Sequence, residues 1–167
     1  MAVVPFDSVE IAEVYFVSSL TLAAPTTTEI NAGTRLTDFI TDGPPSPAGS
    51  NFLDAGTLAS GFQTQVASTY GGGSGSFTVI RKRDTTTTDD SADDAFNLFP
   101  RGTVGYLVTA PFGVSGASNA VAVGDTVNVY PIEVGNRAEN ISRGALSTGT
   151  IDVAFNDLPT IGYELAA

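Results

Sequence analysis

The stretch VGDTVNVYPIEVGN at residues 123–136 constrains the fold of this chain more than any other segment. Turn signals, Gly-Asp and Gly-Asn, stand near its two ends, and β-branched and aromatic residues fill the space between them. That pattern predicts a β-strand. Pro131 lies inside it, although proline has no N–H to donate to a sheet and is normally confined to edges and bulges.

The apolar face of this strand also changes at the proline. Val127 and Val129 share one face before it, whereas Ile132 and Val134 share the opposite face after it. A proline together with a change of face predicts that the strand contains a bulge near Pro131 or lies at the edge of a sheet.

The rest of the sequence predicts a mainly β protein. Thr, Val, Gly, Ser and Ala dominate the 167 residues, and long helix-favouring residues are scarce. Further strand patterns occur at residues 13–17, 35–40, 62–69, 76–83, 103–109 and 149–156. We expect one domain over residues 1–167, folded as a β-sandwich or partial barrel.

One short helix is predicted at residues 90–99. Its apolar side chains recur with helical spacing at Ala92, Ala95, Phe96 and Phe99. Pro100 ends the pattern, and aspartates at its start complement the helix dipole. The aspartate-rich loop before this helix lacks the glycine and the closing glutamate of a calcium loop, so we interpret it as a solvated loop and helix cap.

Two segments show no clear regular pattern. Residues 41–60 begin with three prolines and two glycines, which predicts a projecting loop. Phe52 and Leu53 follow the prolines, and Asp54 stands beside them. An apolar pair on a projecting loop is expected to dock against another surface. Residues 157–167 are interpreted as a C-terminal tail.

Composition argues against catalysis and against binding of nucleic acid. The chain has no cysteine and no histidine, which excludes disulfides, thiol nucleophiles and Ser-His-Asp triads. Its 18 acidic and 7 basic residues give a formal charge of −11, which opposes contact with phosphates. We therefore assign no catalytic, metal-binding or cofactor-binding residue and expect no enzymatic activity. The first residues resemble neither a signal peptide nor a membrane span, which indicates synthesis in a cytoplasm.

Three of the basic residues are consecutive, at Arg81, Lys82 and Arg83. On a strand, Arg81 and Arg83 share a face. They could form a solvated strand end, or contact an acidic neighbour in the same chain or in another copy.

Several segments, taken in order, resemble the major tail tube proteins of long-tailed phages of actinobacteria. They are AEVYFV, APTTTEINAGTRLTDFI, LDAGTLASGFQTQV, FTVIRKRD, DDAFNLFPRGTVGYLV and GDTVNVYPIEVG. The Gly-Tyr-Leu-Val and Val-Tyr-Pro pieces are the most specific, and the resemblance extends from about residue 13 to residue 135.

The resemblance implies a structural virion protein, made in the cytoplasm of the host bacterium. Six copies of such a protein form a ring whose sheets join into an inner barrel, and the rings stack around a tape measure protein. The tail terminator and the distal tail or baseplate proteins are further expected partners. DNA would pass through the lumen without specific binding, because an acidic wall repels phosphates.

Seven residues are candidates for contacts between subunits: Phe52, Leu53, Asp54, Arg81, Arg83, Tyr130 and Pro131. A bulge at Pro131 would curve the sheet where a ring must close. Two other functions stay open at this point. One is a capsid decoration or head-associated β-sandwich protein, and the other is a small ligand-binding β-barrel, although the chain has no tryptophan to line such a cavity.

Overall fold

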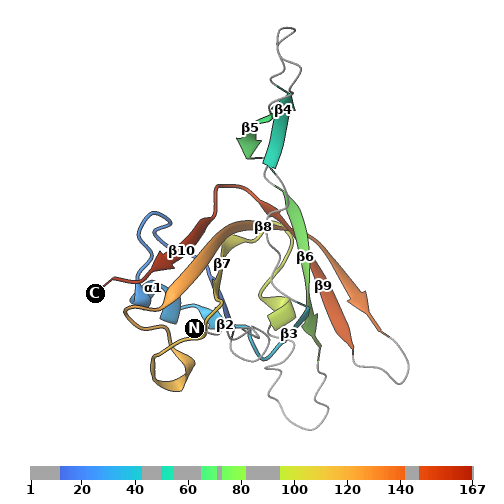
Figure 1. The fold of residues 1–167 in the computed structure, drawn as a ribbon. Helices are drawn as coiled ribbons and strands as arrows, with labels where there is room; N and C mark the ends of the chain where they lie inside the picture. Colours follow the sequence, from blue (N-terminus) through green and yellow to red (C-terminus); the bar gives the residue numbers. More distant parts are fainter. Residues whose placement is uncertain are drawn as a thin grey trace, which may run out of the picture.

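The computed structural model describes residues 12–42, 50–54, 65–70, 73–81, 95–141 and 147–166, and gives only the backbone of residues 50–54 and 65–70. The described part is mostly β-structure with two short helices, and its main sheet curls into a half-barrel (Figure 1). The prediction of a mainly β, tail-tube-like fold is therefore confirmed.

The strands are β1 (Glu13–Val17), β2 (Thr34–Arg35), β3 (Ile40–Asp42), β4 (Ser50–Asp54), β5 (Gln65–Tyr70), β6 (Ser74–Ile80), β7 (Val104–Ala110), β8 (Thr126–Asn140), β9 (Thr148–Phe155) and β10 (Thr160–Glu164). Helix α1 spans Thr27–Asn31, the 3-10 turn η1 spans Ala117–Asn119, and residues 95–97 are helical. The start of the helix predicted at residues 90–99 lies outside the described residues.

The order of the strands explains why the sheet curls. Eight strands pair antiparallel, in the order β2-β1-β7-β8-β9-β6-β3, with β10 beside the first part of β8. Strands β2 and β3 stand at opposite ends of this order, yet only residues 36–39 separate them in the chain. Such a short connection requires the two ends of the sheet to approach each other.

The strand predicted at residues 35–40 is therefore wrong. The chain leaves β2 after Arg35, turns, and enters β3 at Ile40. Leu36 is fully buried in the turn, and its carbonyl accepts hydrogen bonds from the N–H groups of Phe39 and Ile40. Alternation of apolar and polar residues is the same in a strand and in this turn, so it could not separate them.

Helix α1 occupies a segment for which the sequence pattern predicted neither a strand nor a helix. Thr26 caps it, because its hydroxyl accepts the N–H of Glu29 while the Glu29 carboxylate accepts the N–H of Thr26. This reciprocal pair is a capping box, and its Thr-x-x-Glu signature was present in the sequence. Ile30 then points from the helix into the core with no exposed surface.

Two apolar cores pack against opposite faces of the sheet, and neither covers the outer face of β6 and β9. The first core contains Val14, Phe16, Leu36, Phe77, Val79, Ala95, Phe96, Phe99, Leu107, Tyr130, Ile132, Val134, Ile151, Val153 and Phe155. The second contains Tyr15, Val17, Leu20, Ile30, Val108, Ala110, Val121, Val127, Val129 and Leu165. Strand β8 belongs to the second core before Pro131 and to the first core around and after it, so the change of apolar face marks a change of core.

Pro131 lies in the interior of the sheet, and the prediction of an edge or a bulge there is wrong. On one side β8 pairs with β7; on the other it pairs with β10 up to Val129 and with β9 from Ile132. The Val134 N–H donates to the Thr103 carbonyl on the β7 side. Alternation along β8 then directs the Pro131 nitrogen to the opposite side, where the neighbouring strand changes. The missing N–H therefore costs no hydrogen bond of the ladder.

The bulge lies a few residues further along β8. Val134 faces Val153 on β9, and Arg137 faces Ile151, so Gly135 and Asn136 together oppose a single residue of β9. The Gly-Asn pair that was interpreted as the end of the strand is this bulge. Strand β8 continues beyond it to Asn140.

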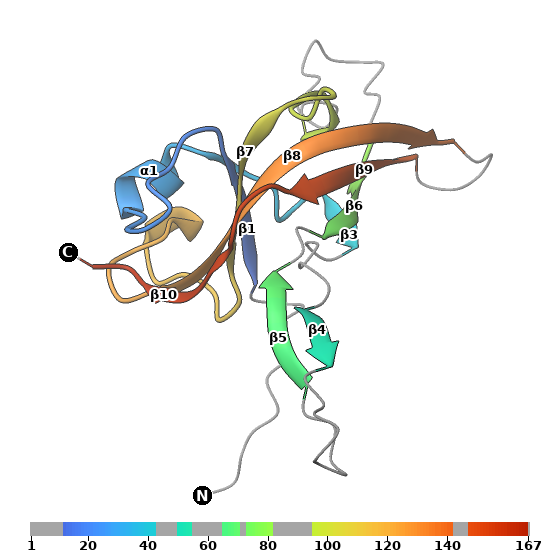
Figure 2. The ribbon, with the colours of Figure 1, turned by 90° about the horizontal axis from the view of Figure 1, so that it is seen from above.

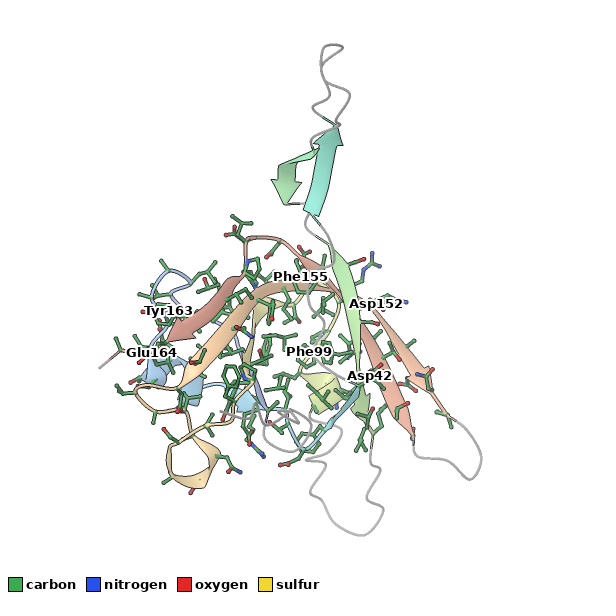
Figure 3. The ribbon with its side chains drawn as sticks, in the orientation of Figure 1. Asp42, Phe99, Asp152, Phe155, Tyr163 and Glu164 are labelled. Atoms are coloured by element: carbon green, nitrogen blue, oxygen red, sulfur yellow. The ribbon has the colours of Figure 1, made fainter. Side chains whose placement is uncertain are left out.

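The apolar stripe predicted from the sequence includes Phe96 and Phe99, and both side chains are buried in the first core. The Phe99 ring makes edge-on contacts with Phe16 on β1 and Phe77 on β6, with ring centroids 4.9 and 5.2 Å apart. Phe99 and Phe155 lie inside the curl of the sheet (Figure 3).

The segment interpreted as a C-terminal tail contains strand β10. Leu165 follows this strand and is buried in the second core. Its N–H donates to the Asp125 carbonyl, and its own carbonyl accepts the N–H of Gly124. These contacts fasten the end of the chain to the turn that precedes β8.

Strands β4 and β5 form a separate antiparallel hairpin with a register shift between Asn51 and Phe52. In two perpendicular views this hairpin stands away from the curled sheet (Figures 1 and 2). Strand β4 runs through part of the loop predicted at residues 41–60.

Candidate functional site

The Phe96 side chain lies in a compact cluster near the C-terminal end of β8. The guanidinium groups of Arg81 and Arg137 lie 4.5 and 4.7 Å from the centre of its ring. Gly149 on β9 leaves the space that the ring fills, because a Cβ atom at this position would overlap the ring carbons. A cation over an aromatic ring is favoured by the ring quadrupole, and here Arg81 is largely buried whereas Arg137 is exposed.

Hydrogen bonds and an ion pair complete this Phe96 cluster. The Arg81 guanidinium lies 2.5 Å from the Glu139 carboxylate, and Arg137 donates to the Phe96 carbonyl over 3.1 Å. Arg81 therefore contacts an acidic neighbour in its own chain, one of the two charge contacts considered from the sequence. Arg83 lies outside the described residues, and contacts of Arg81 or Arg83 with another copy stay a prediction.

A second charged cluster closes the β1–β2 edge. The Glu13 carboxylate accepts two bonds from Arg35, at 2.6 and 2.9 Å, and one from the Thr37 hydroxyl at 2.6 Å. Arg35 also pairs with Asp38. The hydrogen bond to Glu13 raises the pKa of Arg35 above its ordinary value, so the guanidinium at this edge stays charged.

A third cluster fixes the loop between β7 and β8. The Asp125 carboxylate accepts the N–H groups of Ser115 and Ala122, with the shortest bond at 2.8 Å. Burial alone would raise the pKa of Asp125, but these bonds outweigh it and lower the pKa. The Asn31 amide bonds both backbone groups of Val121. A carboxylate occupied by backbone donors holds a loop in place and is poorly suited to act as a general base.

Within the described ranges, the outer face of β6 and β9 is bare and mainly polar, carries no positive charge, and ends at the half-buried Ile80 opposite Thr148. It presents Ser74, Ser76, Thr78, Thr150, Asp152 and Ala154, which alternate with side chains of the first core. Ser76 stands opposite Asp152, and Thr78 opposite Thr150. The arginines of the described ranges lie elsewhere: Arg81 and Arg137 in the Phe96 cluster, Arg35 at the β1–β2 edge, and Arg101 in the turn before β7.

The structure does not bring the predicted interface residues together. Tyr130 is buried, which raises its pKa, and it packs edge-on against Phe155. Pro131 is buried beside it in β8. Phe52, Leu53 and Asp54 lie on β4, with side chains outside the description. Their role in assembly stays a prediction.

Several residues of these surfaces escaped the sequence analysis. Arg137 and Glu139 were missed because the strand was ended at the Gly-Asn pair. Their alternation with neutral residues after Gly135 was the available signal. Glu164 was missed because TIGYE, at residues 160–164, was not recognised as a strand despite its isoleucine and tyrosine.

Within the described ranges, no group of three or more acidic side chains could hold a metal ion, and the same part of the chain contains no helix long and apolar enough to span a membrane.

Comparison with known families identifies the chain. A family model described as phage tail tube protein matches residues 5–167. No curated protein matches the sequence. The family match includes β10 and residues 136–140 of β8, which lie beyond the segments that carried the resemblance in the sequence. The chain belongs to the phage tail tube protein family.

Proposed function

We propose that this protein is the repeating subunit of the tail tube of a long-tailed phage of actinobacteria. Membership of the family makes it a structural component of the virion tail. Beyond that, copies would close into hexameric rings, and the rings would stack around a tape measure protein. Tail terminator and distal tail proteins would contact the two ends of the tube, and the subunit would be made in the cytoplasm of the host.

One observation carries this proposal: the sheet is a half-barrel whose strand order is open. Its end strands β2 and β3 do not pair with each other in the described part of the chain. A closed barrel would leave no strand edge, whereas an open one offers edges to further copies. Contacts that use two different patches close into a ring when the rotation permits.

The bare face of β6 and β9 suits the wall of a channel for DNA. Its serine and threonine hydroxyls are small, and Asp152 supplies negative charge without a basic residue on that face in the described ranges. Such a wall repels phosphates, and the absence of cationic contacts avoids trapping the DNA as it moves.

We expect the purified protein to form hollow tubes or short stacks of rings. Electron microscopy of concentrated protein, with and without short tube fragments as seeds, is the direct measurement. Rings with sixfold symmetry would support the proposal. Monomers or trimers at every concentration and salt, even with seeds, would contradict it and favour the head-decoration alternative.

The β4–β5 hairpin is proposed to reach the adjacent ring. A lone two-stranded hairpin is only marginally stable in water, so it gains from docking. We expect the double change Phe52→Ser and Leu53→Ser to leave the subunit folded but to abolish stacking of rings. The control is Asn51→Ser on the same strand, which keeps the apolar pair and Asp54. Tubes of normal length from the first variant would exclude a role of this pair in stacking.

A further inference from the structure

We propose that β10 of one subunit adds as an antiparallel strand to the distal half of β8, residues 135–140, of a second subunit, with Glu164 opposite Arg137. This inference rests on the proposed tube. It specifies which edges join the copies, and it uses residues outside the interface candidates that the sequence suggested.

Strand β10 offers one free edge. It pairs with β8 through Thr160 and Val129 and through Tyr163 and Val127, and within the described ranges no strand lies on its other side. Ile161, between the two paired positions, is 59% exposed. An exposed strand edge with an apolar side chain beside it favours pairing with another chain.

The hydrogen bonds of β10 show which residue faces outward. The Leu165 N–H donates to the Asp125 carbonyl, so the backbone of Leu165 faces inward. Alternation then directs the N–H and carbonyl of Glu164 away from β8. Because Tyr163 and Leu165 pack against the second core, the Glu164 side chain lies on the opposite face of the sheet.

The receiving edge is the side of β8 on which, in the described ranges, no strand follows beyond the end of β7. Pairing with β7 ends at Glu133, opposite Val104, whereas pairing with β9 continues to Asn140. Val134 directs its backbone to the β7 side. Since the bulge inserts one residue, Arg137 has the same orientation as Val134, and its side chain lies on the face of the first core, over Phe96.

The strand direction, the sheet face and the side-chain charges of these two edges are all compatible with pairing. Strand β10 runs antiparallel to β8 in its own subunit, so a copy in the same orientation presents its β8 antiparallel to that β10. Glu164 and Arg137 both direct their backbones outward, lie on the same face and carry opposite charges. A shift of two residues would place Glu164 opposite Glu139, which like charge disfavours.

The same register brings two exposed apolar side chains together. With Glu164 opposite Arg137, Ile161 comes to the level of Asn140 and Ile141. Ile141 is 76% exposed and Ile161 is 59% exposed. Pairing would cover both isoleucine side chains, which would explain why exposed positions carry apolar residues.

The first test changes the edge and leaves the subunit intact. Glu164→Pro removes the outward N–H and no hydrogen bond of the fold, and Ile161→Lys places a charge at the edge. We expect each variant to keep the circular dichroism spectrum of the wild type, while the protein concentration needed for tubes, measured by sedimentation, rises about tenfold or more. The matched control is Val104→Lys, at a position 58% exposed on β7, which should assemble normally.

The second test fixes the register with cysteines, which the natural chain lacks. The pair Glu164→Cys and Arg137→Cys should give a ladder of disulfide-linked oligomers on oxidation. The pair Glu164→Cys and Glu139→Cys should give no disulfide-linked oligomers. A ladder from the second pair would overturn the proposed register. Absence of a ladder from both pairs would overturn it as well.

Different results would contradict the proposed edge pairing and the proposed tail tube. If the wild type forms tubes and Glu164→Pro forms them equally well, the edge pairing is wrong and the tube stands. If the wild type forms no tubes with seeds, the proposed function and this pairing are both overturned.

Discussion

Replacing Phe99 with alanine should lower the free energy of unfolding of the monomer by about 4 kcal/mol. The side chain has no exposed surface and contacts two other rings edge-on. Removing it leaves a cavity that the surrounding strands can fill only in part. Urea denaturation, followed by circular dichroism at a concentration too low for assembly, measures the loss.

The position of Phe99 explains why its effect should be so large. Phe16 belongs to β1, next to one end of the strand order, and Phe77 belongs to β6, next to the other end. Phe99 therefore links the two ends of the curled sheet. The exposed control Val104→Ala should cost less than about 0.5 kcal/mol. A loss of that small size for Phe99→Ala would show that the ring does not support the curl.

The sequence predicted the features that depend on local alternation. The strand near residues 149–156 appears with a shift of about one residue, because its single apolar face packs on the first core and produces a regular pattern. The helical stripe of Phe96 and Phe99 was informative for the same reason.

Features that depend on distant contacts could not be predicted. Strand β1 is buried on both faces, so its apolar residues do not alternate. The change of face at Pro131 was visible, but its cause, a second core, depends on α1 and on Leu165 far along the chain. The bulge at Gly135 is fixed by its pairing with β9, which a local turn signal cannot show.

The candidate surfaces were predictable only in part. Consecutive basic residues identified Arg81, but its partner Glu139 comes from another strand, and only the curled sheet brings the two together. Open edges are properties of strand order, so β10 and the distal half of β8 could not be recognised before the topology was known. The proline-rich start of residues 41–60 gave no signal for strand β4.

Gly149→Ala should lower the free energy of unfolding by about 2–3 kcal/mol. The new methyl group would overlap the Phe96 ring, which cannot move freely because Arg81 and Arg137 lie over it. Gly135→Ala is the matched control, since a Cβ there meets its nearest atom, the Asp152 carbonyl oxygen, at 3.5 Å. It should change stability by less than about 0.5 kcal/mol.

A double-mutant cycle separates this clash from a general effect on β9. Phe96→Ala alone should be costly, since the ring is buried, but adding Gly149→Ala to it should cost almost nothing further, because the ring that the methyl group strikes is gone. The expected coupling between the two positions is about 2 kcal/mol in urea denaturation of the monomer. Equal costs of Gly149→Ala with and without the ring would show that Phe96 does not fill the space above Gly149. The distal half of β8 would then lack the support that its proposed pairing with β10 requires, because Arg137 takes its position from that ring.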